Sequence, residues 1–250
     1  MIMDSTIKDQ KYKIVWSSDT DIGPVRTENE DSFTIIEPST FVIADGMGGY
    51  AAGEVASKIL TDTAVALLKD TTEITDLSLK QVIIQANRTV VEEAAKNPEK
   101  QGMGTTATLC HIDGNTVYWA HVGDSKLYHL HAGKILQITK DHTYANLLIE
   151  RGEATPTDAA RNASANMLTK AIGVDSVIFA DTGSFSVESG DQLILCTDGL
   201  SGKLSKNTIC DLLTNDLDST KGAETLVRAA LNYGTRDNVT AIVVKILENG

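Results

Sequence analysis

Short apolar runs recur along the chain, and most alternate with polar residues at the two-residue period of a β-strand. Asp113-Gly114 and Ala132-Gly133 stand between successive runs and predict tight hairpin turns. We therefore expect strands, mainly antiparallel, at residues 12–17, 32–36, 40–44, 105–112, 116–122, 126–131, 134–138, 177–185, 192–197 and 239–246.

Four segments instead repeat apolar residues every three or four positions, which is the spacing of an amphipathic helix. They cover residues 52–69, 78–95, 205–213 and 221–233. These helices come in pairs between runs of strands, without the strict β-α-β alternation of a doubly wound parallel sheet. The order favours an α+β fold in which packed antiparallel sheets are covered by helices. Residues 139–172 are polar and have no clean apolar stripe, as in a mobile flap over a surface.

Composition and charge narrow the classes of function. The 250 residues carry a net charge of −12, from 22 Lys and Arg against 34 Asp and Glu, which excludes broad nucleic-acid binding. No apolar run approaches the roughly 20 residues of a membrane span, and the polar start has no signal-peptide core. Cys110, Cys196 and Cys210 show no pairing pattern. We therefore expect buried thiols, a reducing compartment and a cytoplasmic location.

Four carboxylates stand beside the ends of predicted strands. They are Asp45, Asp124, Asp198 and Asp237. Acids held at the ends of several strands can converge on one pocket of oxygen ligands, which suits Mg²⁺ or Mn²⁺. Gly46 follows the first acid, and a residue without a side chain lets its carbonyl approach an ion closely. Because Asp-Gly is also a common hairpin turn, the spacing alone leaves a metal site and a set of structural turns both open.

One arginine lies in an acidic segment just before a predicted strand. The segment reads Arg26-Thr27-Glu28-Asn29-Glu30-Asp31. A guanidinium group can bind two phosphate oxygens through parallel N–H bonds. Beside a cluster of metal-binding acids, Arg26 would therefore suit the hydrolysis of a phosphate ester. The alternative interpretation is a charged loop in solvent.

Two other patterns are weaker. Residues 46–51 formally match G-x-G-x-x-A, but the second strand of a βαβ unit is missing, and no ribose-binding acid stands about 20 residues on. We therefore reject a nucleotide cofactor. The five histidines show no metal-binding spacing at helical periodicity, and His121, His129 and His131, on predicted strands, are expected to be structural.

Seven short motifs follow one another between about residue 12 and residue 247. They are Thr20-Asp21-Ile22-Gly23 with Arg26-Thr27-Glu28-Asn29-Glu30-Asp31, Val42-Ile43-Ala44-Asp45-Gly46-Met47-Gly48-Gly49, Gly104-Thr105-Thr106-Ala107, His121-Val122-Gly123-Asp124-Ser125, Lys140-Asp141-His142-Thr143, Cys196-Thr197-Asp198-Gly199-Leu200 and Arg236-Asp237-Asn238-Val239-Thr240. In this order they make the chain resemble the metal-dependent protein phosphatases of type 2C, in their compact bacterial form. Each motif alone is modest, but the ordered set is specific.

The resemblance implies a four-layer α/β/β/α sandwich, with two packed, mainly antiparallel sheets flanked by helices. It implies a single phosphatase catalytic domain over residues 1–250, with a flap at about 141–173. It also implies a binuclear Mn²⁺ or Mg²⁺ centre and a third, weaker ion. The implied ligands are Asp45 between the two metals, Asp198 and Asp237 at the first, the Gly46 carbonyl with Glu30 at the second, and Asp124 with Asp198 at the third. By the same resemblance, Arg26 would hold the substrate phosphate and Asp31 would orient metal-bound water.

The activity that the resemblance implies is hydrolysis of phosphoserine and phosphothreonine in proteins. A hydroxide that bridges two cations is available near neutral pH and would attack phosphorus directly, without a covalent enzyme intermediate. The implied partners are phosphorylated protein substrates and an opposing Ser/Thr kinase in signal transduction. We expect a monomer, with no nucleic-acid or membrane partner.

Three positions depart from the family pattern. Met47 stands where some relatives have a histidine that can donate a proton, so we expect metal-bound water to protonate the leaving group. Lys126 replaces an arginine found in many relatives. Residues 162–166 lack the usual His-Pro-containing flap stretch, which affects flap order and substrate preference and not the metal chemistry.

Two alternative functions stay open. A pseudo-phosphatase would bind phosphoproteins without turnover, although every implied ligand position except Gly46 holds an acid. A regulatory phosphatase that acts on one anti-sigma-factor antagonist would share the chemistry and differ only in its substrate.

Overall fold

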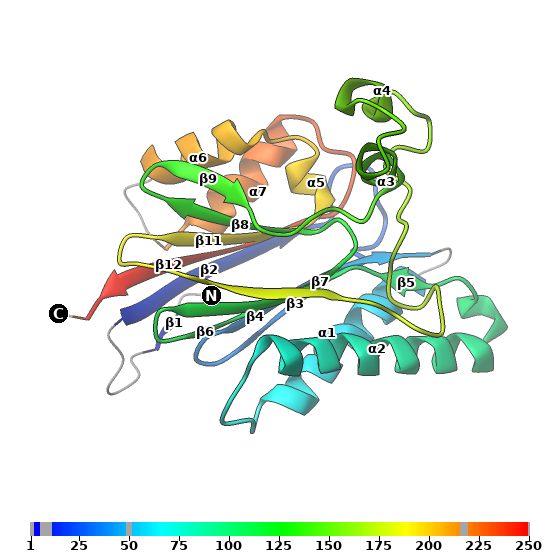
Figure 1. Ribbon diagram of the computed structural model, residues 1–250, viewed down its shortest axis with the longest axis horizontal. Coiled ribbons are helices and arrows are strands. Elements are labelled where there is room, and N and C mark those ends of the chain that lie inside the picture. Colours follow the sequence, from blue (N-terminus) through cyan, green and yellow to red (C-terminus); the bar gives the residue numbers. More distant parts are fainter. Residues whose placement is uncertain (1–2, 6–11, 49–51, 216–219, 250) are drawn as a thin grey trace.

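Two β-sheets lie face to face at the centre of the computed structural model, and helices cover both outer faces (Figure 1). The structure describes residues 3–5, 12–48, 52–215 and 220–249. Every strand pair in these ranges is antiparallel. The layers run helix, sheet, sheet, helix, which confirms the expected α+β sandwich.

The first sheet has six strands in the order β1-β2-β12-β11-β8-β9. Their bounds are Met3–Ser5 (β1), Tyr12–Asp21 (β2), Val239–Glu248 (β12), Gln192–Cys196 (β11), Lys126–His131 (β8) and Lys134–Gln137 (β9). Three helices lie on its outer face: α5 (Asp198–Ser201), α6 (Lys206–Asn215) and α7 (Gly222–Asn232). Their apolar side chains, among them Leu200, Ile209 and Leu226, pack against Ile194 and Val243 of the sheet.

The second sheet has the strand order β10-β7-β6-β4-β3, and β5 pairs with β4 beside it. The bounds are Asp181–Ser186 (β10), Thr116–Val122 (β7), Ala107–Asp113 (β6), Thr40–Met47 (β4), Asp31–Ile36 (β3) and Gly104–Thr105 (β5). Two helices cover it, α1 (Ala52–Leu68) and α2 (Asp76–Lys96), and a short 3-10 helix (Pro98–Lys100) follows. No helix in the described ranges is long and apolar enough to cross a lipid bilayer.

Strand β4 shows why the central strands have nearly unbroken apolar sequences. Phe41 and Ile43 point into the layer between the sheets, where Phe41 meets Trp16 edge to face at 6.5 Å. Val42 and Ala44 point the other way, into the layer under α1 and α2. Because both faces of the strand are buried, the residues that point to either face are apolar. The sheet therefore positions Asp45, the next residue, rigidly.

Several element boundaries differ from the sequence expectations. Strand β2 continues to Asp21 and does not end at residue 17, as expected from the sequence. The run 105–112 is divided at Thr106 into β5 and β6. The strand expected from residue 177 begins only at Asp181, and the side chain of Val177, although apolar, is exposed.

The cysteine prediction is partly wrong. Cys110 and Cys196 are buried thiols, as expected, but Cys210 is partly exposed on α6. Its position on the outer helix layer leaves one side open to solvent. Residues 49–51, the second half of the segment that formally matches G-x-G-x-x-A, lie outside the described residues.

The flap region contains two short helices, α3 (Tyr144–Glu150) and α4 (Pro156–Ala160). The hydroxyls of Thr143 and Thr155 cap them by accepting hydrogen bonds from amides in the first turn. Figure 1 shows both helices standing at one end of the sandwich, beside the loop that leads into α5. A polar, capped segment of this kind explains the absence of a clean apolar stripe.

Candidate active site

The four acids beside strand ends meet at one end of the sandwich. Asp45 lies on β4, Asp198 begins α5 directly after β11, Asp237 precedes β12, and Asp124 lies between β7 and β8. Burial raises the pKa of Asp45 well above its usual range, and repulsion from the other three acids and from Asp31 raises it further. Asp124 and Asp198 line the same cavity, and Asp31 lies opposite Asp45 in the β3–β4 pair, so these carboxylates form one cluster.

Backbone hydrogen bonds fix Asp45 in place. Its amide donates to the Thr106 hydroxyl at 2.9 Å, and its carbonyl accepts from the Thr106 amide at 2.9 Å and the Thr105 hydroxyl at 3.0 Å. The Thr106 hydroxyl is also 2.7 Å from the hydroxyl of Ser125. Because Ser125 follows Asp124, the same threonine ties the turn that carries Asp124 to Asp45.

Gly46 lies where a larger residue does not fit. A Cβ at this position would stand 2.3 Å from the carbonyl oxygen of Gly53 and 2.5 Å from that of Glu30. The Gly46 amide donates to the Glu30 carbonyl at 3.1 Å, and Glu30 Oε1 accepts from the Gly53 amide at 3.2 Å. The close approach of these backbones therefore places Glu30 beside Gly46, with its carboxylate at the first turn of α1.

Arg26 lies at the solvent edge of the acid cluster. Its Nη2 is 2.7 Å from Asp237 Oδ1 and 2.8 Å from Asp237 Oδ2. The side chains of both residues are nearly half exposed, 46% for Arg26 and 41% for Asp237. The guanidinium is thus anchored to an acid of the cluster and remains accessible to a ligand from solution.

Asn238 organises the loop that carries Arg26, a role that the sequence analysis missed. Its side-chain amide donates to the carbonyls of Ile22 at 2.9 Å and Glu28 at 3.0 Å, and its Oδ1 accepts from the Glu30 amide at 2.9 Å. One residue beside Asp237 therefore holds both ends of the Arg26 loop. The partners are more than 200 positions away in sequence, so no local signal could identify them.

Asp31 connects the two sheets. It lies directly opposite Asp45 in the β3–β4 pair, and its Oδ2 accepts hydrogen bonds from the hydroxyls of Thr197 at 2.8 Å and Thr240 at 2.7 Å. Burial raises the pKa of Asp31 to about 7, although both hydroxyl bonds act to lower it. The sequence analysis named Asp31 but missed the two threonines, which only the packing of the sheets brings to it.

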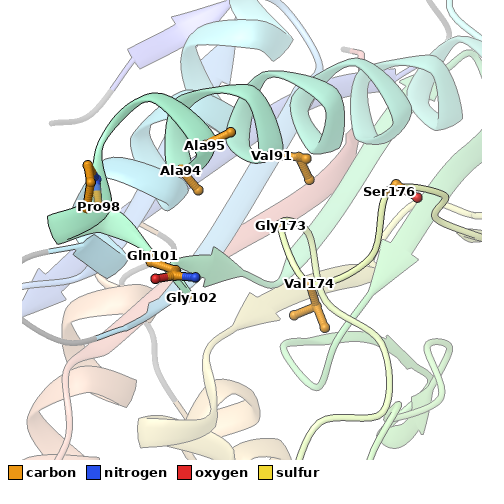
Figure 2. A pocket seen from close by; sticks show the side chains of 9 residues that line it. All are labelled: Val91, Ala94, Ala95, Pro98, Gln101, Gly102, Gly173, Val174 and Ser176. Carbon is orange, nitrogen blue, oxygen red and sulfur yellow. The ribbon is translucent and has the colours of Figure 1, made fainter.

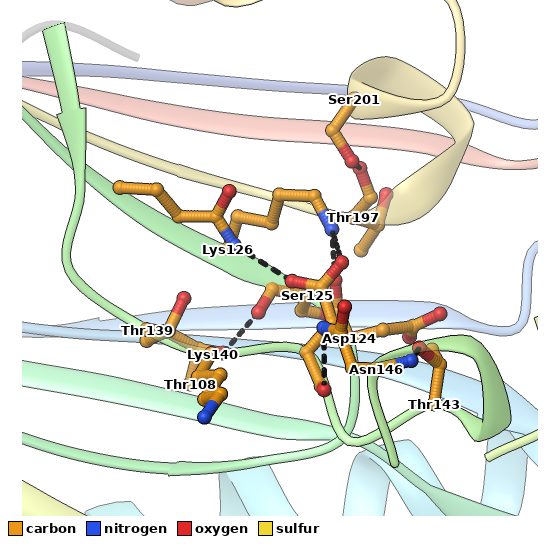
Figure 3. A network of polar contacts seen from close by, with 12 residues as sticks. Thr108, Asp124, Ser125, Lys126, Thr139, Lys140, Thr143, Asn146, Thr197 and Ser201 are labelled. Carbon is orange, nitrogen blue, oxygen red and sulfur yellow. Dashed lines mark hydrogen bonds and ion pairs between the residues drawn. The ribbon is translucent and has the colours of Figure 1, made fainter. Parts of the chain in front are cut away.

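A cavity of about 400 Å³ lies between the acid cluster and the flap. Asp124 and Asp198 line one side, and Thr143 and Asn146 of the flap line the other. Figure 3 shows Asp124 beside Lys126 and these flap residues. Burial raises the pKa of Asp124 to about 7, and repulsion from Asp198 adds to the shift.

Lys126 joins the floor of this cavity to the flap. Its Nζ donates to Asp141 Oδ2 at 2.6 Å and to the Asp124 carbonyl at 3.0 Å. The lysine therefore binds the residue at which the flap begins. The observed contact gives Lys126 a local role at the base of the flap.

A second hollow, of about 610 Å³, lies between α2 and the chain that follows the flap (Figure 2). Its walls are formed by small or uncharged residues, among them Val91, Pro98, Gln101 and Val174. None of its lining residues carries a carboxylate, an imidazole, a thiol or a cationic group. The hollow therefore has no groups for acid–base chemistry or metal binding, unlike the cavity beside Asp124.

The donor set of the acid cluster fits hard divalent cations. Burial raises the pKa of Asp198, and repulsion from Asp237 adds to this effect. Carboxylates that repel one another in a partly buried site gain most from a bound cation, and oxygen-only donors favour Mg²⁺ or Mn²⁺. Asp45, Asp198 and Asp237 could hold such ions.

Comparison with known proteins points to the same class. Residues 26–248 match the family model described as protein phosphatase 2C. The chain is 34% identical over 237 residues to the protein phosphatase PhpP of Streptococcus pneumoniae, across 92% of this chain and 96% of that protein. The alignment therefore covers nearly all of both proteins.

Solved structures agree in fold. The serine/threonine phosphatase Stp1 from Staphylococcus aureus matches with a TM-score of 0.88 at 31% identity, over 99% of this chain and 100% of that one. The catalytic domain of the serine/threonine protein phosphatase PstP, solved in complex with two manganese ions, matches with a TM-score of 0.85 at 32% identity, over 94% of this chain and 99% of that one.

The antiparallel sandwich is that of the serine/threonine phosphatases matched above. The chain belongs to the protein phosphatase 2C family. The family resemblance and the fold expected from it are thereby confirmed, and the chain is an enzyme of the phosphatase class.

Proposed function

We propose that this chain is a metal-dependent Ser/Thr phosphoprotein phosphatase, and that residues 1–250 form one catalytic domain with a flap at about 141–173. The observation that carries the proposal is the cluster around Asp45, with the accessible guanidinium of Arg26 bound to one of its acids. The manganese ions of the PstP structure and the serine/threonine names of Stp1 and PstP support it.

The proposed site holds two Mn²⁺ or Mg²⁺ ions and a third, weaker one. The ligands would be Asp45, Asp198, Asp237, the Gly46 carbonyl, Glu30 and, for the third ion, Asp124 with Asp198. When bound, the metal pair would supply the attacking water as a bridging hydroxide. Direct attack by this water needs no nucleophilic side chain from the protein.

Arg26 would bind the phosphoryl oxygens of the substrate. In the structure its guanidinium pairs with Asp237, at 2.7 Å. A cation on Asp237 would compete for that carboxylate and leave the planar guanidinium available to two phosphate oxygens. The exposed position of Arg26 at the edge of the cluster is compatible with this exchange.

Asp31 would orient the attacking water through its carboxylate. Its Oδ2 accepts hydrogen bonds from the hydroxyls of Thr197 and Thr240. The other carboxylate oxygen, Oδ1, would therefore contact the water. Met47 has no proton to donate, so the leaving oxygen would take its proton from water in the site.

The biological setting is part of the same proposal. Phosphorylated proteins would be the substrates, and a Ser/Thr kinase would be the opposing partner in cytoplasmic signal transduction. We expect the enzyme to act as a monomer, without a nucleic-acid or membrane partner. The flap beside the Asp124 cavity offers the surface at which a phosphopeptide would contact residues other than the acids.

The test is phosphate release from phosphoserine, phosphothreonine and phosphotyrosine peptides in the presence of Mn²⁺. We expect turnover of the first two peptides and much less of the third. Asp198→Asn should remove turnover while preserving the fold, which circular dichroism would check. Wild-type turnover by Asp198→Asn would contradict the site assignment. Phosphopeptide binding without turnover by the folded wild type would favour a pseudo-phosphatase.

A further inference from the structure

Two histidines and an aspartate form a second cluster on the first sheet. His129 Nε2 lies 2.8 Å from Asp191 Oδ2, and His131 Nδ1 lies 2.6 Å from Asp191 Oδ1. One ligand atom from each of the three residues lies within 4.8 Å of the other two. The carboxylate therefore meets the two imidazoles with a different oxygen each.

The cluster is remote from the acid site. His131 ends β8 and Asp191 immediately precedes β11, whereas Asp124 precedes β8 and Asp198 follows β11. At about 3.3 Å per residue, the length of β8 alone separates its two ends by roughly 16 Å. The same two paired strands thus carry a different group of titratable side chains at each end.

The geometry of β8 brings the histidines together. Residues two apart on a strand point to the same face, so both imidazoles lie on the side of the sheet that faces β10. The His129 ring lies 5.0 Å from the Phe185 ring of β10, and its side chain is only 14% exposed. Contact with Phe185 therefore limits the movement of this imidazole.

The other two members differ in exposure in a way that suits a ligand from solution. The side chain of Asp191 is 3% exposed, and its Oδ2 also accepts a hydrogen bond from the Glu188 amide at 2.9 Å. The side chain of His131 is 52% exposed. The cluster therefore has a fixed carboxylate on its inner side and an accessible imidazole on its outer side.

We propose that His129, His131 and Asp191 form a binding site for one borderline divalent cation, Zn²⁺ or a similar ion such as Co²⁺. Two imidazole nitrogens and one carboxylate oxygen are a common donor set for Zn²⁺, with a fourth position open to water. The atoms that now share hydrogen bonds are the atoms that would bind the ion, so binding would displace the protons between them. Mg²⁺ and Mn²⁺, which prefer oxygen donors, would bind here less well.

Such an ion would join the end of β8 to the start of β11. Gly190 and Asp191 already pair with Ile246 of β12, through hydrogen bonds of 2.8 and 3.0 Å. A bound cation would therefore stabilise the junction of three neighbouring strands. Spacing alone did not reveal this site, because the histidines are two apart on a strand and Asp191 is 60 positions after His131.

The test compares Zn²⁺ binding by the wild type, His131→Gln and His111→Gln. His131 is exposed, so its replacement should preserve the fold, and His111 is a matched histidine on a strand of the other sheet. Because Zn²⁺ can also enter the acid cluster, the readout is site-specific: shifts of the histidine ring signals in NMR spectra recorded during a Zn²⁺ titration.

We expect Zn²⁺ to shift the His129 and His131 signals of the wild type and of His111→Gln. In His131→Gln, the affinity read from the His129 signal should fall by at least about tenfold. Visible absorption of bound Co²⁺ should fall in the same variant, because nitrogen ligands are lost. Unchanged His129 affinity in His131→Gln, or Zn²⁺ shifts confined to residues around Asp45, would overturn the proposal.

Discussion

The two ends of strands β8 and β11 carry different chemistry. At one end, Asp124 and Asp198 join a cluster in which burial and mutual repulsion raise the pKa values of Asp45, Asp124 and Asp198. At the other end, Asp191 meets two imidazoles, and its pKa is lowered. Burial alone would raise that pKa, but the Glu188 amide and the imidazoles outweigh it.

A position at the end of a strand therefore does not by itself decide how the charge of a carboxylate is balanced. Arg26 and Lys126 offset part of the negative charge at the acid end, and a bound cation or protons would offset more of it. The imidazole end compensates its own carboxylate through His129 and His131. A bound cation would therefore favour the ionised form of the acid end, and at the imidazole end it would add stability to a carboxylate that is already paired.

The largest expected effect comes from breaking the acid end at its centre. Asp45→Asn removes the carboxylate that every other acid of the cluster influences, so phosphatase activity should fall by at least about 100-fold. Steady-state kinetics with Mn²⁺ would measure the loss. The matched control is Asp113→Asn, an exposed acid of an Asp-Gly hairpin, which should keep wild-type activity. Equal activities of the two variants would contradict the assignment.

The next effect concerns the accessible arginine at the acid end. Arg26→Ala should lower kcat/KM by about 100-fold, and Arg26→Lys should restore only part of it, because an ammonium group cannot bind two oxygens in parallel. Arg88→Ala, on the exposed face of α2, serves as the control. If Arg26→Ala retained the wild-type kcat/KM, the guanidinium would have no role in phosphate binding.

A smaller effect distinguishes the stability of the acid end with and without metal. The pKa of Asp31 is raised from 3.8 to about 7, so its contribution to stability is present below pH 4 and is lost as the pH rises through 7. Asp31→Asn can keep the hydroxyl bonds through its amide oxygen and removes this titration. In EDTA at pH 8, the variant should therefore be more stable than the wild type, by on the order of 2 kcal/mol.

Denaturant unfolding at several pH values would measure this difference. The gap between Asp31→Asn and the wild type should grow from pH 4 to pH 8 and shrink when Mn²⁺ is added. With Mn²⁺, the variant should be about 10- to 100-fold less active, because its amide no longer orients the attacking water as a carboxylate would. A difference in stability that is independent of pH would show that the pKa of Asp31 is not raised in the folded protein.

The smallest effect is expected at the imidazole end. His131→Gln should leave phosphatase kinetics unchanged, because the cluster is separated from Asp124 by the length of β8. Asp191 raises the pKa of His131, so the stabilising pair is present below pH 6.5 and is lost as the pH rises through the folded-state value. The thermal stabilities of the variant and the wild type should therefore differ most at acidic pH. A loss of activity would reveal coupling between the two ends.

Much of the fold was predictable because its signals are local. Alternation of apolar residues located the central strands, and helical periodicity located α1, α2, α6 and α7. The predicted strand boundaries were wrong where an apolar residue is exposed and lies outside the sheet. Val177 is apolar but exposed, and the strand begins only at Asp181.

The candidate site was also predictable only in part. Asp45, Asp198 and Asp237 could be singled out because each stands next to a strand. The contacts of Asn238 with the Arg26 loop, and those of Thr197 with Asp31, depend on segments more than 160 positions apart. Sequence motifs included these polar residues, but only the packing of the two sheets revealed their roles.

The most direct test of the central claim is hydrolysis of p-nitrophenyl phosphate by the purified protein, with EDTA, Mg²⁺ or Mn²⁺ added in turn. This substrate requires no knowledge of the natural phosphoprotein. The account predicts activity that appears with Mn²⁺ or Mg²⁺ and disappears with EDTA. Activity that EDTA leaves intact, or a folded protein that is inactive with every metal, would contradict it.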